Sequence, residues 1–163
     1  MELLLTKQIV FDAKPDAVPY NYRISYKVSQ ICLIVAMCCS RGGCSLVKLH
    51  IISNALNTRA YMDILDDYAN DRTPFMIARF DPAVNRAIKY AIADKLLVQQ
   101  KNGKFRLADK GKSLVKKMEK EKDLLVVEKE YLTKLGTRLT DERLERLISY
   151  WRYSNADNQE IKD

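Results

Sequence analysis

The stretch KLLVQQKNGKFRLADKGKSLVKKM, residues 95–118, carries the strongest fold signal in this chain. The short apolar run at 96–98 and the alternating pair Phe105 and Leu107 predict two strands. Between them stands the dipeptide Asn-Gly at 102–103, which is typical of a tight hairpin turn with positive φ at both central positions. We therefore expect a helix end followed by a basic two-stranded hairpin.

A helix is expected directly after this hairpin. Asp109 can cap its first turn, and Leu114, Val115 and Met118 recur at helical spacing. A basic hairpin that leads into a helix forms the wing of a winged helix. The pattern KFRLADKGKSL resembles the aromatic, basic, Leu, Thr, x, Lys-Gly signature that closes the wing in many winged-helix proteins, with Ala108 in place of the usual Thr. The predicted fold class is mainly α with a small β-wing: a winged helix-turn-helix with extra C-terminal helices.

Two helices are expected to form the core ahead of the hairpin. Residues 25–40 are apolar nearly all round, which is typical of a buried helix. The glycine pair at 42–43 ends this helix, and Ser45 can cap the next one. The apolar stripe of the second helix is predicted to consist of Leu46, Leu49, Ile52 and Leu56.

The middle of the chain predicts two more helices. The first spans 58–70, with its aspartates outward, and its inward residues are predicted to be Tyr61, Ile64, Leu65 and Tyr68. Residues 75–80 form either a short strand or a connector. The pair Asp81-Pro82 then supplies the cap and first-turn proline of another helix, which occupies the recognition-helix position if the fold binds DNA.

The last third predicts further helices at 111–123, 124–135 and 139–153, separated by short breaks. The final one carries an apolar stripe that a single helix cannot bury alone, so it either folds back on the core or forms a subunit interface. The stripe consists of Leu144, Leu147, Ile148 and Trp151. The predicted organisation is an extended arm at 1–22, a winged-helix domain at 23–120, C-terminal helices at 121–154 and a polar tail at 155–163.

Composition restricts the class of partner. The 163 residues suit one domain, and 28 Lys plus Arg against 21 Asp plus Glu give a net charge of +7, which favours nucleic acid or an acidic protein as partner. No secretory signal is recognisable, and the longest apolar run, 31–39, has about half the length that a bilayer crossing requires. We expect a cytoplasmic protein without a membrane partner. In that compartment the cysteines are expected to be reduced thiols rather than disulfides; they are Cys32, Cys38, Cys39 and Cys44.

Few residues in the sequence suggest catalysis or metal binding. Its single histidine, His50, falls near an apolar stripe and is expected to be a packed or surface residue rather than a general base. A zinc site built from Cys38, Cys39, Cys44 and His50 is disfavoured, because adjacent helical cysteines point about 100° apart and no C-x-x-C pair occurs. A phosphate-cradling glycine loop is also missing. We therefore expect no catalytic residue, no metal, no cofactor and no small-molecule substrate.

Binding is the remaining class of function. Candidate nucleic-acid contacts lie on the helix after Asp81-Pro82 and on the hairpin, and the alternative is that these charges form a solvated face. The candidates are Arg86, Lys89, Lys101, Lys104 and Arg106. Only Asn85 and Arg86 could read base edges, so contact with the phosphate backbone without sequence preference is favoured.

Three motifs resemble the middle-component proteins of bacterial ABC-three-component systems, which include small subunits of Lamassu- and Menshen-type anti-phage defence. They are YRISYKVSQ entering the first helix at 22–30, RGGCSLVKLH at 41–50, and the hairpin motif NGKFRLADKG at 102–111. The resemblance implies a non-catalytic accessory subunit that bridges an SMC/Rad50-like ATPase and an effector, with the wing touching double-stranded DNA or an acidic face of the ATPase. Partner contacts would then be Tyr20, Tyr22, Leu144, Leu147 and Trp151.

A second class of function competes with this one. A stand-alone winged-helix transcriptional regulator would dimerise through the C-terminal helices and shift a specific duplex at physiological salt. An accessory subunit would instead bind DNA weakly, with steep salt dependence and no sequence preference.

Overall fold

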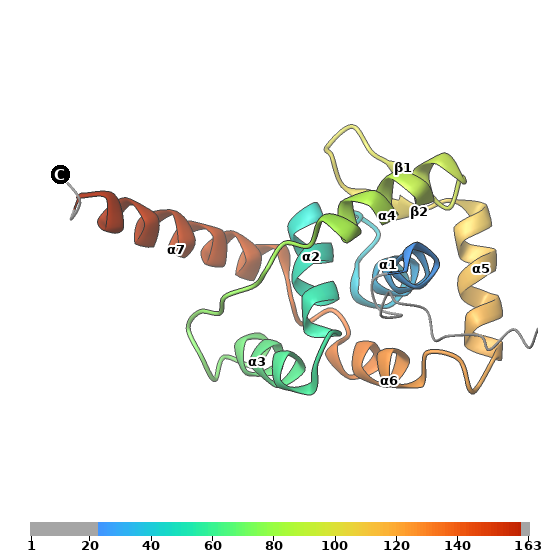
Figure 1. The fold of residues 1–163 in the computed structure, drawn as a ribbon, viewed down its shortest axis with the longest axis horizontal. Helices are drawn as coiled ribbons and strands as arrows, with labels where there is room; N and C mark the ends of the chain where they lie inside the picture. The colour runs from blue at the N-terminus through green and yellow to red at the C-terminus, as the bar shows by residue number, and fades with distance from the viewer. Residues whose placement is uncertain (1–22, 161–163) are drawn as a thin grey trace, which may run out of the picture.

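The computed structural model describes residues 23–160, with side chains described through 154. This part of the chain is mainly helical and carries one small antiparallel sheet of two strands (Figure 1). The expected arm at 1–22, including Tyr20 and Tyr22, lies outside the described residues. The elements in order are α1 (Ile24–Cys38), α2 (Leu46–Ala55), α3 (Arg59–Ala69), α4 (Pro82–Ala93), β1 (Leu97–Gln99), β2 (Phe105–Leu107), α5 (Asp109–Lys120), α6 (Val126–Leu135) and α7 (Asp141–Glu160).

Helix α1 is the centre of the fold, as its sequence predicts. Its middle residues, 31–34, have no exposed surface. In Figure 1, α1 lies inside a ring made by α2, α4, α5 and α6, and it contacts all four. A helix that is apolar nearly all round can bury every side only when neighbours surround it.

Side-chain caps fix the starts of α2, α3 and α4. Ser45 Oγ accepts a hydrogen bond from Lys48 N at 3.2 Å, which confirms the predicted start of α2. Asp81 Oδ1 accepts from Ala83 N at 2.9 Å with Pro82 at the first helical position, which confirms the start of α4. At α3, Thr58 provides the same kind of cap.

Two predicted apolar faces differ in detail from the structure. In α2, Leu46 is 43% exposed, whereas residues 48–55 are all buried, so the helix is enclosed rather than striped. In α3, Ile64 is also 43% exposed; Met62 takes an inward position, and Asp66 is buried rather than outward. Residues 75–80 form a connector without a strand.

The hairpin forms where the sequence predicts it, with Leu97 opposite Leu107 and Gln99 opposite Phe105. Its turn is different from the predicted one, because only Gly103 has positive φ, at 82°. Gly103 N donates to Gln100 O at 2.9 Å, and Gln100 N donates to Lys104 O at 2.8 Å, so the loop has three residues and ends in a left-handed glycine.

A third backbone segment pairs with this hairpin. Cys44, between α1 and α2, forms an isolated bridge with Phe105. Cys44 N donates to Phe105 O at 2.7 Å, and Phe105 N donates to Cys44 O at 2.8 Å. The bridge fastens the hairpin to the α1–α2 loop.

Helix α5 begins at Asp109 itself, the residue predicted to cap it. Ala108 occupies the N-cap position and offers no side-chain hydrogen bond, while Asp109 is the first helical residue. Gly111 is required for a different reason: a Cβ atom there would lie 2.2 Å from the carbonyl oxygen of Leu96. The glycine of the Lys-Gly signature therefore lets the first turn of α5 lie directly against Leu96, the residue that precedes β1.

Helix α6 and the first turns of α7 pack on the core. Leu144 and Leu147 are 3% and 1% exposed and belong to the main hydrophobic cluster, so the structure favours the first of the two alternatives for this stripe. Neither side chain leaves surface for a partner, which corrects their assignment as partner contacts. Helix α7 continues to Glu160, beyond the predicted start of the tail at 155, and extends away from the body (Figure 1).

Candidate nucleic-acid interface

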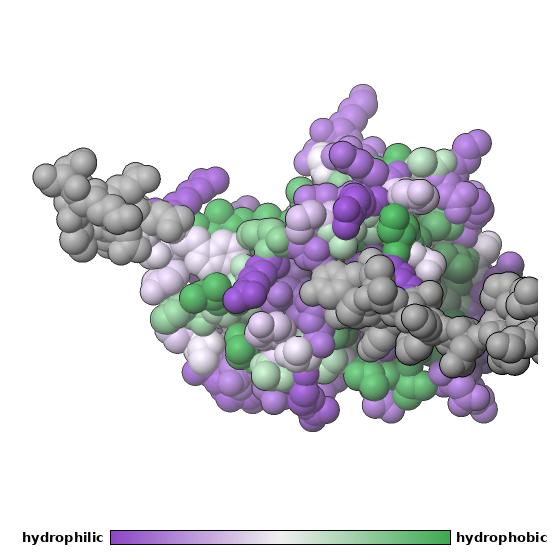
Figure 2. Space-filling model, in the orientation of Figure 1, coloured by the Kyte–Doolittle hydropathy of each residue, from purple (hydrophilic) through white to green (hydrophobic). Residues whose placement is uncertain are grey.

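Helix α4 turns its basic side outward. Val84, Ala87 and Ile88 are buried against the core, while Arg86 and Lys89 are exposed on the opposite side. Neither Arg86 nor Lys89 has an ion pair within the described part of the chain. Hydrophilic residues protrude at the α4 and hairpin end of the molecule in Figure 2.

The hairpin cations are not equivalent. Lys101 and Arg106 are exposed and lack ion pairs among residues 23–154. Lys104 is half-buried, and its Nζ lies 2.7 Å from Asp141 Oδ2 in the first turn of α7. This hydrogen bond raises the pKa of Lys104 and uses its charge to link the hairpin to α7. Of the five predicted nucleic-acid contacts, four are exposed without an ion pair within the described residues, and Lys104 is paired with Asp141.

One of the two candidate base-reading residues has an internal partner. Asn85 Oδ1 lies 3.0 Å from His50 Nε2, and the buried His50 ring meets Phe80 edge-on at 4.8 Å. Burial lowers the pKa of His50, so it is neutral at physiological pH and can donate this hydrogen bond through Nε2. His50 is a packed residue, as the sequence predicts, and Arg86 remains the exposed base-reading candidate.

A buried row of polar groups, which sequence reasoning missed, crosses the core. Lys27 is 1% exposed; its Nζ donates to Ser53 Oγ at 3.1 Å and lies 3.8 Å from Asp81 Oδ2. Ser53 in turn donates to Gln30 Oε1 at 2.6 Å. Burial lowers the pKa of Lys27, and the negative charge of Asp81 partly opposes that effect. The row ties α1 and α2 to the residue that caps α4.

The same row continues to α6. Gln30 Nε2 donates to the Tyr26 hydroxyl at 3.3 Å, and that hydroxyl donates to Glu128 Oε1 at 2.7 Å. A lysine and a glutamine three residues apart in an apolar helix were the only sequence signal for it.

The cysteines differ in their surroundings and therefore in their pKa values. Burial raises the pKa of Cys32 to about 11 and that of Cys38 to about 12. A hydrogen bond from Cys44 lowers the pKa of Cys39, with Lys48 nearby adding to the effect. No group of His, Cys, Asp and Glu side chains in the described part of the chain is arranged to hold a metal ion.

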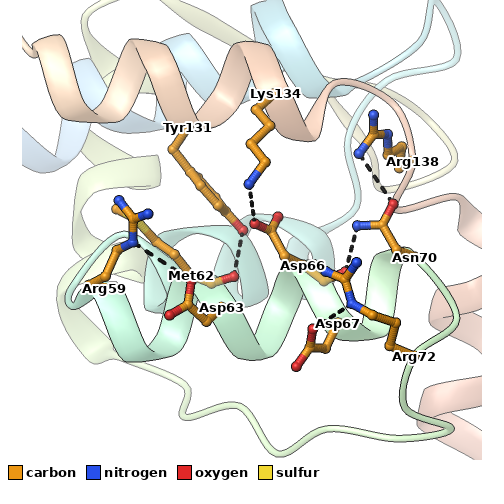
Figure 3. Close-up of polar contacts among 10 residues, drawn as sticks. All are labelled: Arg59, Met62, Asp63, Asp66, Asp67, Asn70, Arg72, Tyr131, Lys134 and Arg138. Carbon is orange, nitrogen blue, oxygen red and sulfur yellow. Dashed lines mark hydrogen bonds and ion pairs between the residues drawn. The ribbon is translucent and has the colours of Figure 1, made fainter.

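Figure 3 shows the polar contacts between α3 and α6, where a cavity of about 150 Å³ lies. Lys134 Nζ and Tyr131 OH both reach from α6 to α3: Lys134 pairs with Asp66 Oδ2 at 3.0 Å, and Tyr131 donates to Met62 O at 3.4 Å. Most charges that line this cavity are paired with opposite charges: Lys134 with Asp66, which holds α6 on α3, and Arg59 with Asp63 within α3. They are therefore engaged in the fold rather than free for a charged ligand.

A hydrophobic surface lies on the connector and α7, where Figure 2 shows green residues. Trp151 Nε1 donates to Met76 O at 2.9 Å, and the ring of Tyr150 stacks on that of Phe75 at 4.7 Å. The exposed apolar residues of this surface, called the aromatic surface below, are Phe75, Ile77, Phe80, Tyr150 and Tyr153. Trp151 is half-buried beneath it, which modifies its predicted role as a direct partner contact.

Comparison with protein-family models, curated proteins and solved structures found no match for the chain. Within residues 23–160, no helix combines the length and the apolar character that a bilayer crossing requires.

Proposed function

We propose that this chain is a non-catalytic winged-helix subunit that contacts the backbone of double-stranded DNA without sequence preference. The order of elements supports the fold: α1, the Cys44 bridge, α2, α4, β1, the hairpin loop and β2 follow the succession of a winged helix. Helix α3 and the connector are inserted between α2 and α4.

The observation that carries this proposal is the set of unpaired cations on α4 and the hairpin. Arg86, Lys89, Lys101 and Arg106 are exposed, and none has an ion pair among the described residues. Phosphate contacts need exposed cations, whereas base reading needs side chains with two directed hydrogen-bonding groups. Because Asn85 is engaged by His50, backbone contact is favoured over operator reading.

The test measures duplex affinity against salt concentration for Lys101→Gln combined with Arg86→Gln. The expected result is a loss of affinity that is equal for unrelated duplex sequences, with a salt slope that falls by about 0.9 for each phosphate that the variant no longer neutralises. Lys120→Gln combined with Lys122→Gln removes the same charge near the far end of α5 and is the matched control (Figure 1). Equal losses in both variants would remove α4 and the hairpin from the interface.

The aromatic surface supports the second part of the proposal, that the chain is an accessory subunit of an SMC-like ATPase in an anti-phage defence complex. Arg79 and Arg152 flank this surface and have no ion pair within the described part of the chain. The segments 74–80 and 146–154 contain no carboxylate. Exposed apolar side chains with unpaired arginines around them suit an acidic protein partner.

Co-purification tests this role. Ile77→Ser combined with Tyr153→Ser changes side chains that are 79% and 75% exposed, so folding should be preserved. We expect an SMC-like ATPase to co-elute with the wild-type chain and with the control Val127→Ser, which alters an exposed residue on α6, but not with the double variant. A homodimer with strong preference for one duplex would instead favour the alternative, a transcriptional regulator.

A further inference from the structure

A hollow of about 280 Å³ lies at the base of the hairpin, between the end of α1, β2 and the first turns of α5. Its rim carries the side chains of Arg41, Arg106 and Lys112, together with Ser40. No carboxylate lines it, and its apolar wall comes from Val35 and Leu107.

The three cations of this hollow lack strong counter-charges. Neither Arg41 nor Arg106 has an ion pair within residues 23–154. Lys112 has one contact with Asp109 at 3.9 Å, but that carboxylate is fully exposed and strongly screened by solvent. Three like charges around one concavity repel each other, and an anion placed among them relieves that repulsion.

We infer that this hollow binds a phosphate group, supplied by the backbone of nucleic acid. Guanidinium groups match phosphate oxygens through paired N–H donors, and a hydroxyl adds a further donor, so Arg41, Arg106 and Ser40 supply suitable chemistry. The apolar wall strengthens each charged contact, because it excludes water from one side.

Nucleic acid is favoured as the source of the phosphate because the hollow is continuous with the hairpin cations. Arg106 lies opposite Val98 on the outer side of the sheet, and the connecting loop carries Lys101. A backbone that runs along the hairpin can therefore place one phosphate in the hollow. This part of the inference rests on the proposed function, whereas the binding of phosphate itself does not.

The first experiment titrates the full-length, ¹⁵N-labelled chain with inorganic phosphate at constant ionic strength and pH. We expect saturable shifts confined to residues 40–43 and 106–112. These shifts should vanish in Arg41→Gln combined with Lys112→Gln. They should persist in Lys116→Gln combined with Lys117→Gln, which removes two exposed cations of α5 outside the hollow. Shifts that are absent, or spread over every basic surface, overturn the site.

The second experiment measures duplex affinity against salt for the same two variants. The Arg41→Gln and Lys112→Gln variant should neutralise one phosphate fewer than the wild type, so its salt slope should be lower by about 0.9. The slope of the control variant should stay unchanged. An unchanged slope in both variants, with duplex binding intact, removes nucleic acid from the hollow but leaves the proposed function standing. A wild-type chain that shifts with phosphate but has no duplex affinity at low salt overturns the proposed function.

Discussion

Gly111 provides the sharpest test of how α5 closes the hairpin. In a helix interior, replacing glycine by alanine normally stabilises by about 1 kcal/mol. Here the added Cβ would lie 2.2 Å from Leu96 O and 3.0 Å from a methyl group of Leu107. A main-chain oxygen cannot rotate away as a side chain can, so we assign overpacking the upper end of its usual range, about 3 kcal/mol. The expected net effect of Gly111→Ala is a loss of about 2 kcal/mol.

Thermal and urea unfolding followed by circular dichroism measure this effect. A loss of about 2 kcal/mol lowers the midpoint of a chain of this size by about 4 to 8 °C. Local separation should also appear in hydrogen exchange of the Ala108 amide, which donates to Leu96 O at 2.9 Å in the wild type. A Gly111→Ala variant that unfolds at or above the wild-type temperature would refute the close approach of α5 to Leu96 O.

Two other glycines are matched controls, because each isolates one physical cause. At Gly42 the nearest atom to an added Cβ is Ser40 Oγ at 3.8 Å and φ is ordinary, so Gly42→Ala should stabilise by about 0.4 to 1 kcal/mol. At Gly103 nothing lies within 4 Å, but φ is +82°, so Gly103→Ala should lose roughly 1 to 2 kcal/mol through backbone strain alone. The expected order of stability is Gly42→Ala, then Gly103→Ala, then Gly111→Ala.

Three further predictions concern other elements. In urea titrations, Ala108→Thr should raise the free energy of unfolding by about 1 kcal/mol, because threonine supplies the side-chain cap that α5 lacks. Ser45→Ala should lower the free energy of unfolding by a similar amount, because it removes the cap of α2. An Ala108→Thr variant with unchanged stability would contradict the cap geometry. Cys39 should react first with iodoacetamide, since it alone combines partial exposure with a lowered pKa, and Cys39→Ser should abolish the fast phase. Burial lowers the pKa of Lys27, so between that pKa and about 10.4 the unfolded chain binds more protons than the folded one. The stability of the wild type relative to Lys27→Met should therefore rise with pH across that window. A difference that stays constant with pH would refute the burial of the Lys27 charge.

The sequence predicted best those features that depend on local patterns. The all-apolar run of α1, the Ser45 cap and the Asp81-Pro82 start of α4 each follow from residues within one or two turns, and the structure confirms all three. For the hairpin turn, the Asn-Gly dipeptide predicted the position correctly but not the turn type. The turn type depends on the loop length, which no single dipeptide encodes.

Features that depend on distant partners could not be predicted. The burial of Asp66 is understandable only from Lys134, which lies 68 residues away on α6. Cys44 contributes a bridge of one residue, which is too short to show any periodicity. The pairing of Lys104 with Asp141 likewise joins two segments whose packing no local pattern specifies.

Interior polar groups hold the start of helix α4 in place. His50, the single histidine, is the residue most suited to act as a general base, yet it and Asp81 both hold α4 in place. Asp81 caps α4 beside the buried Lys27, and His50 engages Asn85 in the first turn of that helix. Trp151 fixes the preceding connector through Met76 O. Contacts from α1, α2 and α7 thus converge on the start of α4 and on the connector before it, and α4 carries outward cations beside the hairpin. If the proposed function holds, such preorganisation would let weak phosphate contacts add without an ordering cost for each one.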